Sequence, residues 1–346
     1  GQSADWIAQS LVDDPHAPAP PSEAEQTALS SATLDSAPPH VCGDYPEWLD
    51  ASMARAFGDA RGEEGAALAA PAPLDLRINT LKAERGKLVA ALGESPKLKE
   101  PPGATPHAPN GICIPWSQGR TFPWASEQSF LKGWFEVQDE GSQLAVALSG
   151  VKPGMQVADV CAGGGGKTLA LAALMENKGQ IYAYDVDARR IAPLKERADR
   201  AGARNIQIRT PMRTRDALEE LHERMDLVLV DAPCSGSGTW RRNPDSKWRL
   251  RPNALAMRLQ EQREALALAA PLVKPGGQLL YVTCSVLPEE NEDQIAAFLT
   301  SHSDFAAVAL PRSDIPGYPR GLALQMTPLK TGCDGFFVAA LERRGG

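Results

Sequence analysis

The sequence lacks the features that mark membrane-spanning, secreted and metal-binding proteins. No apolar run approaches the roughly 18 residues of a membrane span, and the first 30 residues show no basic start followed by an apolar run, so no secretory leader is expected. The six cysteines include no Cys-x-x-Cys pair and only five histidines are present, which argues against a disulfide framework and a zinc site. We therefore expect a cytoplasmic protein with no metal and no membrane partner.

Basic residues are fewer than acidic ones, but the acidic excess lies at one end of the chain. The 346 residues carry a formal net charge of −7, yet residues 1–70 alone hold twelve acidic and two basic side chains. Residues 71–346 are therefore net +3, with basic runs at 189–215 and 241–251. The overall charge argues against a polyanionic partner, whereas this distribution leaves nucleic acid open as a partner.

The composition predicts a globular protein with one large domain and a smaller one. Hydrophobic residues make up 43% of the chain and charged residues 23%, which excludes wholesale disorder. Residues 14–40 are rich in Pro, Ala and Ser, as in a linker or an extended arm. A strand pattern over residues 74–81 precedes a helical one over 84–92. We predict a flexible acidic arm over residues 1–44, an α+β subdomain over 45–135 and a catalytic domain over 136–346.

Beyond Gly154, apolar strand patterns alternate with longer helical patterns, which predicts an α/β fold with a parallel, Rossmann-like sheet covered by helices on both faces. The expected strands are 157–161, 180–184, 206–209, 227–231 and 278–283, with a late strand at 335–341. The expected helices are 167–177, 188–201, 215–223, 254–272 and 290–301.

A glycine-rich turn, DVCAGGGGKT, follows the first of these strands and begins a helix, so the backbone can approach a ligand closely there. A phosphate-binding Walker loop needs glycine where Cys161 stands, and a dinucleotide fingerprint needs Gly or Ala where Thr168 stands. Asp185 ends the second strand, 22 residues after Gly163, where a carboxylate can accept both ribose hydroxyls. An adenosine ligand such as S-adenosylmethionine fits best; the alternative is an ordinary tight turn.

Two cysteines and an acid follow neighbouring strands. Asp231 and Cys234 come just after the fourth strand, and Cys284 ends the next one. A thiolate there could add to C6 of a pyrimidine and so activate C5 toward methylation, while Asp231 could hydrogen-bond the base. The alternatives are that Asp231 caps its loop and that either cysteine is inert packing.

These motifs resemble the Sun/Nop/NSUN family of S-adenosylmethionine-dependent RNA 5-methylcytosine methyltransferases, and occur in the same order. DVCAGGGGKT, AYDVD, VDAPCSGSGTWRRNPDSKW and YVTCSVLPEENEDQ carry the resemblance in the catalytic part. YPEWL and LRINTLKAERGKL look like the family's N-terminal RNA-binding subdomain, VQDEGSQ like its pre-core segment and TGCDGFF like its C-terminal strand. The resemblance implies a class I methyltransferase sheet and covers residues 45–343.

The resemblance also implies roles for matched residues. Cys284 of the TCS motif would attack C6, Cys234 of the PCSGSG motif would assist release of the product, and Asp231 would steady the cytosine and touch the cofactor. Lys247 of PDSKW matches a recurrent family lysine and is placed with the catalytic residues. The implied cofactor contacts are Cys161, Ala162, Gly163, Gly164, Gly165, Gly166, Lys167, Asp185 and Asp231.

Two departures from the family pattern are visible. Gly163 and Gly164 replace the usual Ala-Pro of the cofactor loop, which should make the turn more flexible. Where the family often carries an acid that meets the adenine amine, this chain has Thr-Pro-Met-Arg over residues 210–213, so Met212 would only pack on the ring.

A basic segment follows the Cys234 loop, in which arginines alternate with Trp240 and Trp248. This pattern predicts a rim that contacts RNA phosphates and stacks bases, with a solvated charged face as the alternative. Its members are Arg241, Arg242, Lys247, Arg249 and Arg251.

The combined prediction is an RNA cytosine-C5 methyltransferase that acts on small-subunit rRNA, with tRNA as the second choice of substrate and a ribosomal subunit or precursor particle as a candidate partner. The target cytosine must leave its stack to reach a thiolate. A non-catalytic RNA-binding ribosome assembly factor and a DNA methyltransferase are the alternatives; the latter would need a target-recognition domain for which the chain has no room.

Overall fold

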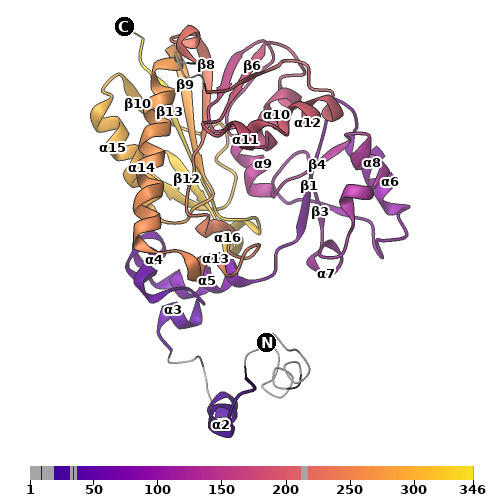
Figure 1. Cartoon of the computed structure of the whole chain (residues 1–346), viewed down its shortest axis with the longest axis vertical. Helices are drawn as coiled ribbons and strands as arrows, with labels where there is room; N and C mark the ends of the chain where they lie inside the picture. The colour runs from indigo at the N-terminus through magenta and orange to yellow at the C-terminus, as the bar shows by residue number, and fades with distance from the viewer. Residues whose placement is uncertain (1–8, 10–18, 32–33, 35–36, 212–216, 346) are drawn as a thin grey trace.

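A computed structural model describes residues 9, 19–31, 34, 37–211 and 217–345. Within this part of the chain the strands form two sheets, one of nine strands and one of four (Figure 1). No helix of the described part is both long and apolar enough to cross a bilayer. The described residues also contain no group of three or more His, Cys, Asp and Glu side chains placed to hold a metal ion.

The large sheet is parallel on one side and antiparallel on the other. Its strand order is β11-β12-β13-β9-β8-β5-β6-β7, with β10 beside β13. The strands from β7 across to β9 pair in parallel, whereas β13 runs antiparallel to β9 and β12. The strands are β5 (Gln156–Asp159), β6 (Gln180–Tyr184), β7 (Ile206–Arg209), β8 (Met225–Asp231), β9 (Val273–Thr283), β10 (Phe305–Val308), β11 (Tyr318–Arg320), β12 (Ala323–Met326) and β13 (Phe336–Arg343).

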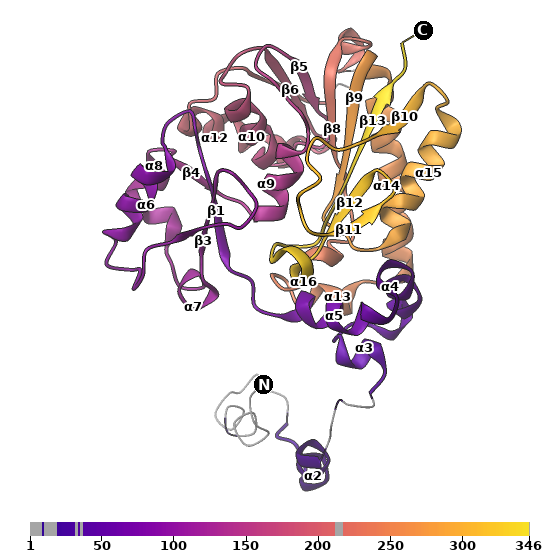
Figure 2. The same cartoon turned by 180° about the vertical axis from the view of Figure 1, so that it is seen from behind.

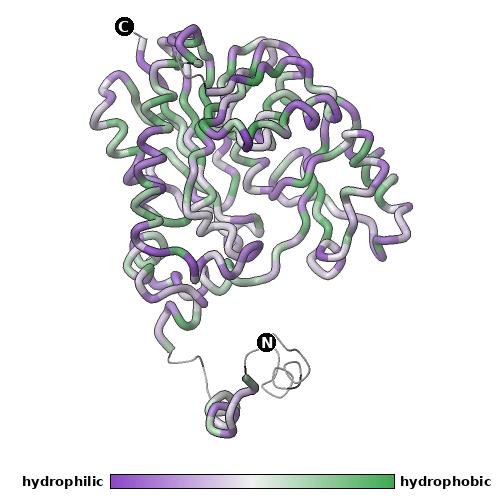
Figure 3. The backbone as a smooth tube through the Cα atoms, in the orientation of Figure 1, coloured by the Kyte–Doolittle hydropathy of each residue, from purple (hydrophilic) through white to green (hydrophobic). Residues whose placement is uncertain are grey.

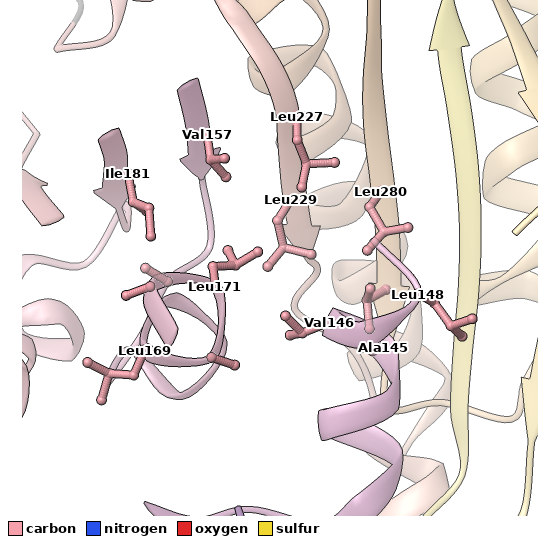
Figure 4. Close-up of a cluster of buried hydrophobic side chains, with 14 of the residues drawn as sticks. Ala145, Val146, Leu148, Val157, Leu169, Leu171, Ile181, Leu227, Leu229 and Leu280 are labelled. Carbon is pink, nitrogen blue, oxygen red and sulfur yellow. The ribbon is translucent and has the colours of Figure 1, made fainter. Parts of the chain in front are cut away.

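Helices cover both faces of this sheet because its middle strands are apolar on both. In β8, Leu227 and Leu229 point into one core while Val228 and Val230 point into the other. Figure 4 shows the first core, where Leu227 and Leu229 meet the helices below them. In Figure 3 hydrophobic residues gather along the middle strands, and the flanking helices alternate in colour. α9 (Glu140–Ala147), α10 (Gly166–Leu174), α11 (Ala188–Ile191) and α12 (Leu194–Ala201) cover the first face, and α14 (Pro252–Ala269) and α15 (Glu292–Ser301) the second.

The small sheet is antiparallel, in the order β2-β3-β1-β4, and has its own apolar cluster. It stands beside the α9 side of the large sheet in both views (Figures 1 and 2). Its elements are β1 (Leu74–Ile78), β2 (Gly103–Ala104), β3 (Gly111–Ile114) and β4 (Phe135–Val137), with α6 (Arg85–Gly93), α7 (Trp116–Gly119) and α8 (Gln128–Leu131).

The helices before β1 pack on the catalytic part and not on the small sheet. Tyr45, Leu49 and Met53 share an apolar cluster with Trp240 and Val286, which flank the two cysteine loops. The segment predicted as one α+β subdomain over residues 45–135 is therefore packed in two places. These helices are α3 (Pro39–Cys42), η1 (Glu47–Leu49), α4 (Asp50–Phe57), η2 (Gly58–Ala60) and α5 (Arg61–Ala69), with α2 (Glu23–Ser31) farther out, and α13 (Ser246–Arg249) and α16 (Pro328–Thr331) lie nearby (Figure 2).

The α/β Rossmann-like fold with helices on both faces is confirmed. Strands β6 and β7 have the predicted bounds. The predicted helix over 188–201 is wrong in one respect: it is interrupted before Pro193, which has no N–H to continue the hydrogen-bond ladder. The helix expected over 215–223 is also wrong for residues 217–223, where the structure has only the 3-10 turn η4 (Glu219–Leu221).

Candidate active site

The candidate site lies at the carboxyl ends of the parallel strands. β5 pairs with β6 on one side and with β8 on the other, and β8 pairs with β9, so the loops after these four strands meet at one edge. The chain order changes direction at β5, which is where open α/β sheets bind their ligands. The residues predicted from the motifs all follow these strands, so the parallel pairing brings them together.

The glycine turn joins β5 to α10 in a conformation that needs glycine. Gly163 and Gly165 have φ of 49° and 85°, in the left-handed region that side chains disfavour. A Cβ on Gly165 would also lie 2.2 Å from Leu194 Cδ1. The carbonyl oxygen of Gly164 accepts a hydrogen bond from Arg197 Nη1 at 2.5 Å, so the turn is held from outside by a charged side chain.

Asp185 closes this turn from the neighbouring strand. Its Oδ2 accepts the backbone N–H of Gly163 at 2.9 Å, and its Oδ1 accepts that of Asp187 at 2.9 Å. The Nη1 atom of Arg190 lies 3.6 Å from the same Oδ2. The acid and the glycine backbone are thus brought into contact, as a ribose-binding corner requires, and they fit an adenosine ligand by the chemistry of the donors and acceptors present.

Lys167 and Asp231 meet across the same edge. Lys167 Nζ, in the first turn of α10, lies 2.7 Å from Asp231 Oδ2 at the end of β8. Burial by itself would lower the pKa of Lys167, but the Asp231 carboxylate outweighs it and raises that pKa above its usual value. Among the described residues only Lys167 is hydrogen-bonded to this carboxylate, and Asp231 keeps 32% of its side chain exposed. Asp231 can therefore still meet a ligand.

The two cysteines predicted from separate motifs are in contact. Their Sγ atoms lie 3.3 Å apart, and both residues are half-buried. The hydrogen bond to Cys284, together with burial, raises the pKa of Cys234 well above its usual value. Cys234 therefore holds its proton more firmly than an ordinary thiol.

Contacts between backbones hold the two cysteine loops in place. The N–H of Gly238 donates to the carbonyl of Cys284 at 3.0 Å, and that of Gly335 donates to Gly238 at 2.8 Å. A Cβ on Gly238 would lie 2.1 Å from the Gly335 oxygen. Gly238, the last glycine of PCSGSG, and Gly335, the second glycine of TGCDGFF, are thus required by one close backbone approach.

Sequence reasoning missed a buried acid that joins these loops. Glu290 of the PEENEDQ segment is fully buried and accepts hydrogen bonds from Ser235, Ser285 and Gln262. Asp159 at the end of β5 was also missed; it accepts from Thr168 Oγ1 at 2.7 Å behind the glycine turn. For Asp159 the available signal was a charged residue at the end of an apolar strand, whereas Glu290 lies among other acidic residues and no local signal distinguished it.

The prediction that Arg241 stands on an exposed RNA-contacting rim is wrong. Its side chain is 5% exposed, and its Nε lies 2.5 Å from Asp334 Oδ1. Arg242 pairs with Asp334 and, at 2.7 Å, with Asp139, although 29% of its side chain stays exposed. Both arginines therefore join three chain segments, because two buried carboxylates need cationic partners.

Two further residues of this basic segment, Trp240 and Lys247, are buried and not exposed as the prediction requires. Trp240 is 1% exposed within the apolar cluster of α4, so it offers no stacking surface. Lys247 is also buried, and its Nζ is paired with Asp44, a residue assigned to the flexible arm. Arg249 does lie at the surface, where it pairs with Asp245 at 2.6 Å. Met212 lies outside the described residues.

Comparison with known proteins agrees with this geometry. The model of the family described as 16S rRNA methyltransferase RsmB/F matches residues 146–342. The chain belongs to this family. Its members are S-adenosylmethionine-dependent methyltransferases, so this chain is an enzyme of that class with S-adenosylmethionine as cofactor.

Individual relatives extend the match beyond the catalytic part. The chain is 36% identical to the probable ribosomal RNA small subunit methyltransferase B of Synechocystis sp., over 86% of this chain and 67% of that protein. It is 32% identical to the ribosomal RNA small subunit methyltransferase B of Photorhabdus laumondii, over 92% of this chain and 70% of that one. A methyltransferase homologue from Pyrococcus horikoshii superposes with a TM-score of 0.72 at 29% identity, covering 88% of this chain and 97% of that structure. The chain thus spans about two thirds of the two named relatives.

Proposed function

We propose that this chain methylates C5 of a cytosine in small-subunit rRNA through a covalent bond between Cys284 and C6 of the base. The observation that carries the proposal is the pair of thiols, 3.3 Å apart, beside the Lys167–Asp231 ion pair. Small-subunit rRNA is the substrate in the names of the relatives, and the resemblance of the TCS and PCSGSG motifs supports the order of the two thiols.

The roles of the side chains follow from the chemistry of the pyrimidine ring. Attack of the Cys284 thiolate on C6 forms an S–C bond and moves electron density to C5, which becomes nucleophilic. Asp231 accepts a hydrogen bond from the exocyclic amine and so orients the base, while Lys167 holds the Asp231 carboxylate in place. S-adenosylmethionine, when bound, supplies the electrophilic methyl group. Cys234 then assists release, in which the C5 proton passes to water, the C5=C6 double bond forms again and the S–C6 bond breaks to return the Cys284 thiolate.

The residues that would hold the cofactor are those of the glycine turn and Asp185. The turn presents backbone N–H groups at the start of α10, and Asp185 supplies the carboxylate for the ribose hydroxyls. Lys247 has no direct part in this scheme; we propose that it holds the Cys234 side of the site in place through its buried pair with Asp44. The protein would act in the cytoplasm on a ribosomal subunit or its precursor.

The test is methyl transfer from tritiated S-adenosylmethionine to unmodified RNA by wild type, Cys284→Ala and Cys234→Ala. Small-subunit rRNA, the same rRNA in its particle, and tRNA are compared in parallel. Label in rRNA cytosine that disappears in Cys284→Ala, with a protein–RNA adduct that accumulates in Cys234→Ala, supports the proposal. Label that appears in tRNA alone would identify tRNA, and not rRNA, as the substrate. RNA binding by wild type without transfer to any of the three would favour the assembly-factor alternative.

A further inference from the structure

Glu290 lies between the two cysteine loops and contacts both. Its Oε1 accepts hydrogen bonds from the backbone N–H of Ser235 at 2.7 Å and from Gln262 Nε2 at 3.0 Å. Its Oε2 accepts from the hydroxyl groups of Ser235 and Ser285. Ser235 follows Cys234 and Ser285 follows Cys284, so one carboxylate fixes the residue after each thiol.

Among the described residues, the Glu290 carboxyl has no cation beside it. Burial raises the pKa of Glu290 above its usual value, while the hydrogen bonds from Ser235, Ser285 and Gln262 favour the carboxylate and oppose that shift. The side chain is fully buried, and no described Lys or Arg forms an ion pair with it. Gln262 Nε2 donates to the Pro233 carbonyl at 2.9 Å as well, so its amide is itself held in one orientation. A buried anion that is stabilised only by hydrogen bonds is costly, and it disfavours a second negative charge nearby.

The other ionisable groups around the thiols do not offset this charge. Lys167 and Asp231 form a pair with no net charge. Burial raises the pKa of Tyr281 well above its usual value, and its neutral hydroxyl donates to the Glu290 carbonyl at 2.7 Å. Burial likewise raises the pKa of Cys161, which keeps that thiol neutral. The hydrogen bond to Cys284 and burial raise the pKa of Cys234 most, and the Glu290 carboxylate, with no described cation to offset it, raises that pKa further.

We propose that Glu290 is a positioning residue that joins the two cysteine loops and whose charge keeps Cys234 in the thiol form, so that the thiolate of the pair forms on Cys284. The two serines and Gln262 hold the carboxylate in place, and the carboxylate in turn selects which sulfur becomes the nucleophile. The use of this selection in methyl transfer rests on the proposed function. Which thiol loses its proton first, however, can be measured on the protein alone.

Glu290→Gln separates the charge from the geometry. The glutamine carbonyl can replace Oε1, and its amide can donate to the two serine hydroxyls that now donate to Oε2. The measurement is the pH dependence of alkylation of each cysteine by iodoacetamide, read by peptide mass spectrometry without RNA or cofactor. We expect Cys284 to react at lower pH than Cys234 in wild type, and Cys234 to shift by about one pH unit toward lower pH in Glu290→Gln.

Two matched variants distinguish charge from structure. Ser237→Ala removes two hydrogen bonds of 2.9 Å between the same loops, with the Ser285 hydroxyl and from the Val286 N–H, but no charge. Glu289→Gln removes the neighbouring charge, which is partly exposed and paired with Arg55. Neither should move the alkylation of Cys234. An unchanged Cys234 profile in folded Glu290→Gln, or a wild type in which Cys234 reacts first, overturns the proposal. Because no RNA is involved, this result is independent of the methyl-transfer test.

A second observation concerns a groove between the small sheet and the segment after Cys234. Its cavity of about 260 Å³ is lined by Pro73, Trp116 and Arg120 on one side and by Arg241 and Arg242 on the other. Trp116 is 46% exposed, and the exposed Arg120 forms no ion pair with any described residue. An exposed indole beside an unpaired guanidinium is the chemistry that binds an unstacked nucleotide.

We infer that this groove binds a nucleotide of the RNA that flanks the target cytosine, with its base on Trp116 and its phosphate at Arg120. The inference rests on the proposed function for its RNA. The proposed RNA-contacting surface therefore lies near α7, at Trp116 and Arg120, and does not depend on the buried Arg241 side chain. The groove and the thiols are connected through one short segment, since Arg241 lies seven residues after Cys234.

The test measures affinity for small-subunit rRNA by filter binding. Trp116→Leu should weaken binding about tenfold, whereas Trp116→Phe should keep most of the affinity because it still stacks. Arg120→Ala should reduce the salt dependence by about one phosphate contact. Trp48→Leu, which replaces an exposed tryptophan outside the groove, is the matched control. Equal affinities for wild type, Trp116→Leu and Arg120→Ala overturn the inference, and binding is read out whether or not methyl transfer occurs.

Discussion

The ammonium group of Lys167 lies 2.7 Å from Asp231 Oδ2 and so connects the glycine turn of β5 with the loop of Cys234. The lysine is almost fully buried, whereas the carboxylate keeps 32% of its side chain exposed. The pair therefore presents a carboxylate in a fixed position at the edge where the two thiols meet. Neither residue could be exchanged for a neutral one without leaving a charge at this edge unpaired.

Loss of the lysine should abolish this arrangement. We expect Lys167→Met to lower the rate of methyl transfer at least about a hundredfold, because Asp231 loses the cation that orients it. Lys178→Met is the control, since Lys178 pairs with Glu176 at the surface. The measurement is the initial rate with rRNA at saturating cofactor. A Lys167→Met rate equal to that of Lys178→Met would contradict the assigned role.

Replacing a buried arginine of the predicted rim should destabilise the protein more than replacing an exposed one. Arg241→Ala leaves Asp334 buried without one of its cations and should lower the free energy of unfolding by about 3 kcal/mol. Arg249→Ala removes a solvent-exposed pair with Asp245 and should cost less than about 0.5 kcal/mol. Urea unfolding followed by circular dichroism measures both. Similar losses for the two variants would show that Arg241 is not structural.

The glycine turn offers a test of backbone conformation. In Gly165→Ala the alanine would have to adopt the positive φ of Gly165, and its Cβ would lie against Leu194. We therefore expect this substitution to lower the unfolding free energy by about 2 kcal/mol. Gly164→Ala in the same turn meets only the flexible end of Arg197 and should cost less than about 1 kcal/mol. Thermal melts of the two variants, with and without cofactor, make the comparison. The turn would be less constrained than described if Gly165→Ala melted like wild type.

Asp159 should make stability depend on pH. Burial raises its pKa to about 7, above the value of about 3.9 for an unfolded aspartate. The folded state therefore binds the proton more tightly, and the stability from this group is complete below about pH 4 and is lost as the pH rises through 7. Asp159→Asn does not titrate, so its stability relative to wild type should rise by about 3 kcal/mol over this window. Denaturant titrations at pH 4.5, 6 and 7.5 measure the difference; a constant difference would show an ordinary pKa.

Local sequence was sufficient wherever the pattern itself dictates the structure. The short apolar runs, each followed by a helical pattern, predicted the parallel sheet, because strands of alternating α/β units must be buried on both faces. Asp185, Asp231, Cys234 and Cys284 were predicted to converge because each follows a strand of that sheet. Pro193 marked the break in the predicted helix 188–201, although the periodic pattern concealed it.

The partners of charged residues could not be predicted from the sequence. The arginines after Cys234 have the same local pattern whether they face RNA or carboxylates, and Asp334 lies 93 residues from Arg241. Lys247 and Asp44 are 203 residues apart, so no local pattern connects them. The same is true of Glu290, which lies 55 residues after Ser235 although its Oε1 accepts the Ser235 backbone N–H at 2.7 Å.

The sequence by itself therefore determined the class of fold, the edge of the sheet where the site lies and the residue types that meet there, because hydrophobic periodicity and strand ends are local properties. Only the tertiary structure decided which charges are buried, which carboxylate joins the two cysteine loops and which tryptophan stays exposed. These depend on the approach of segments far apart in the chain, and the energy of a charge depends on its burial and its partner.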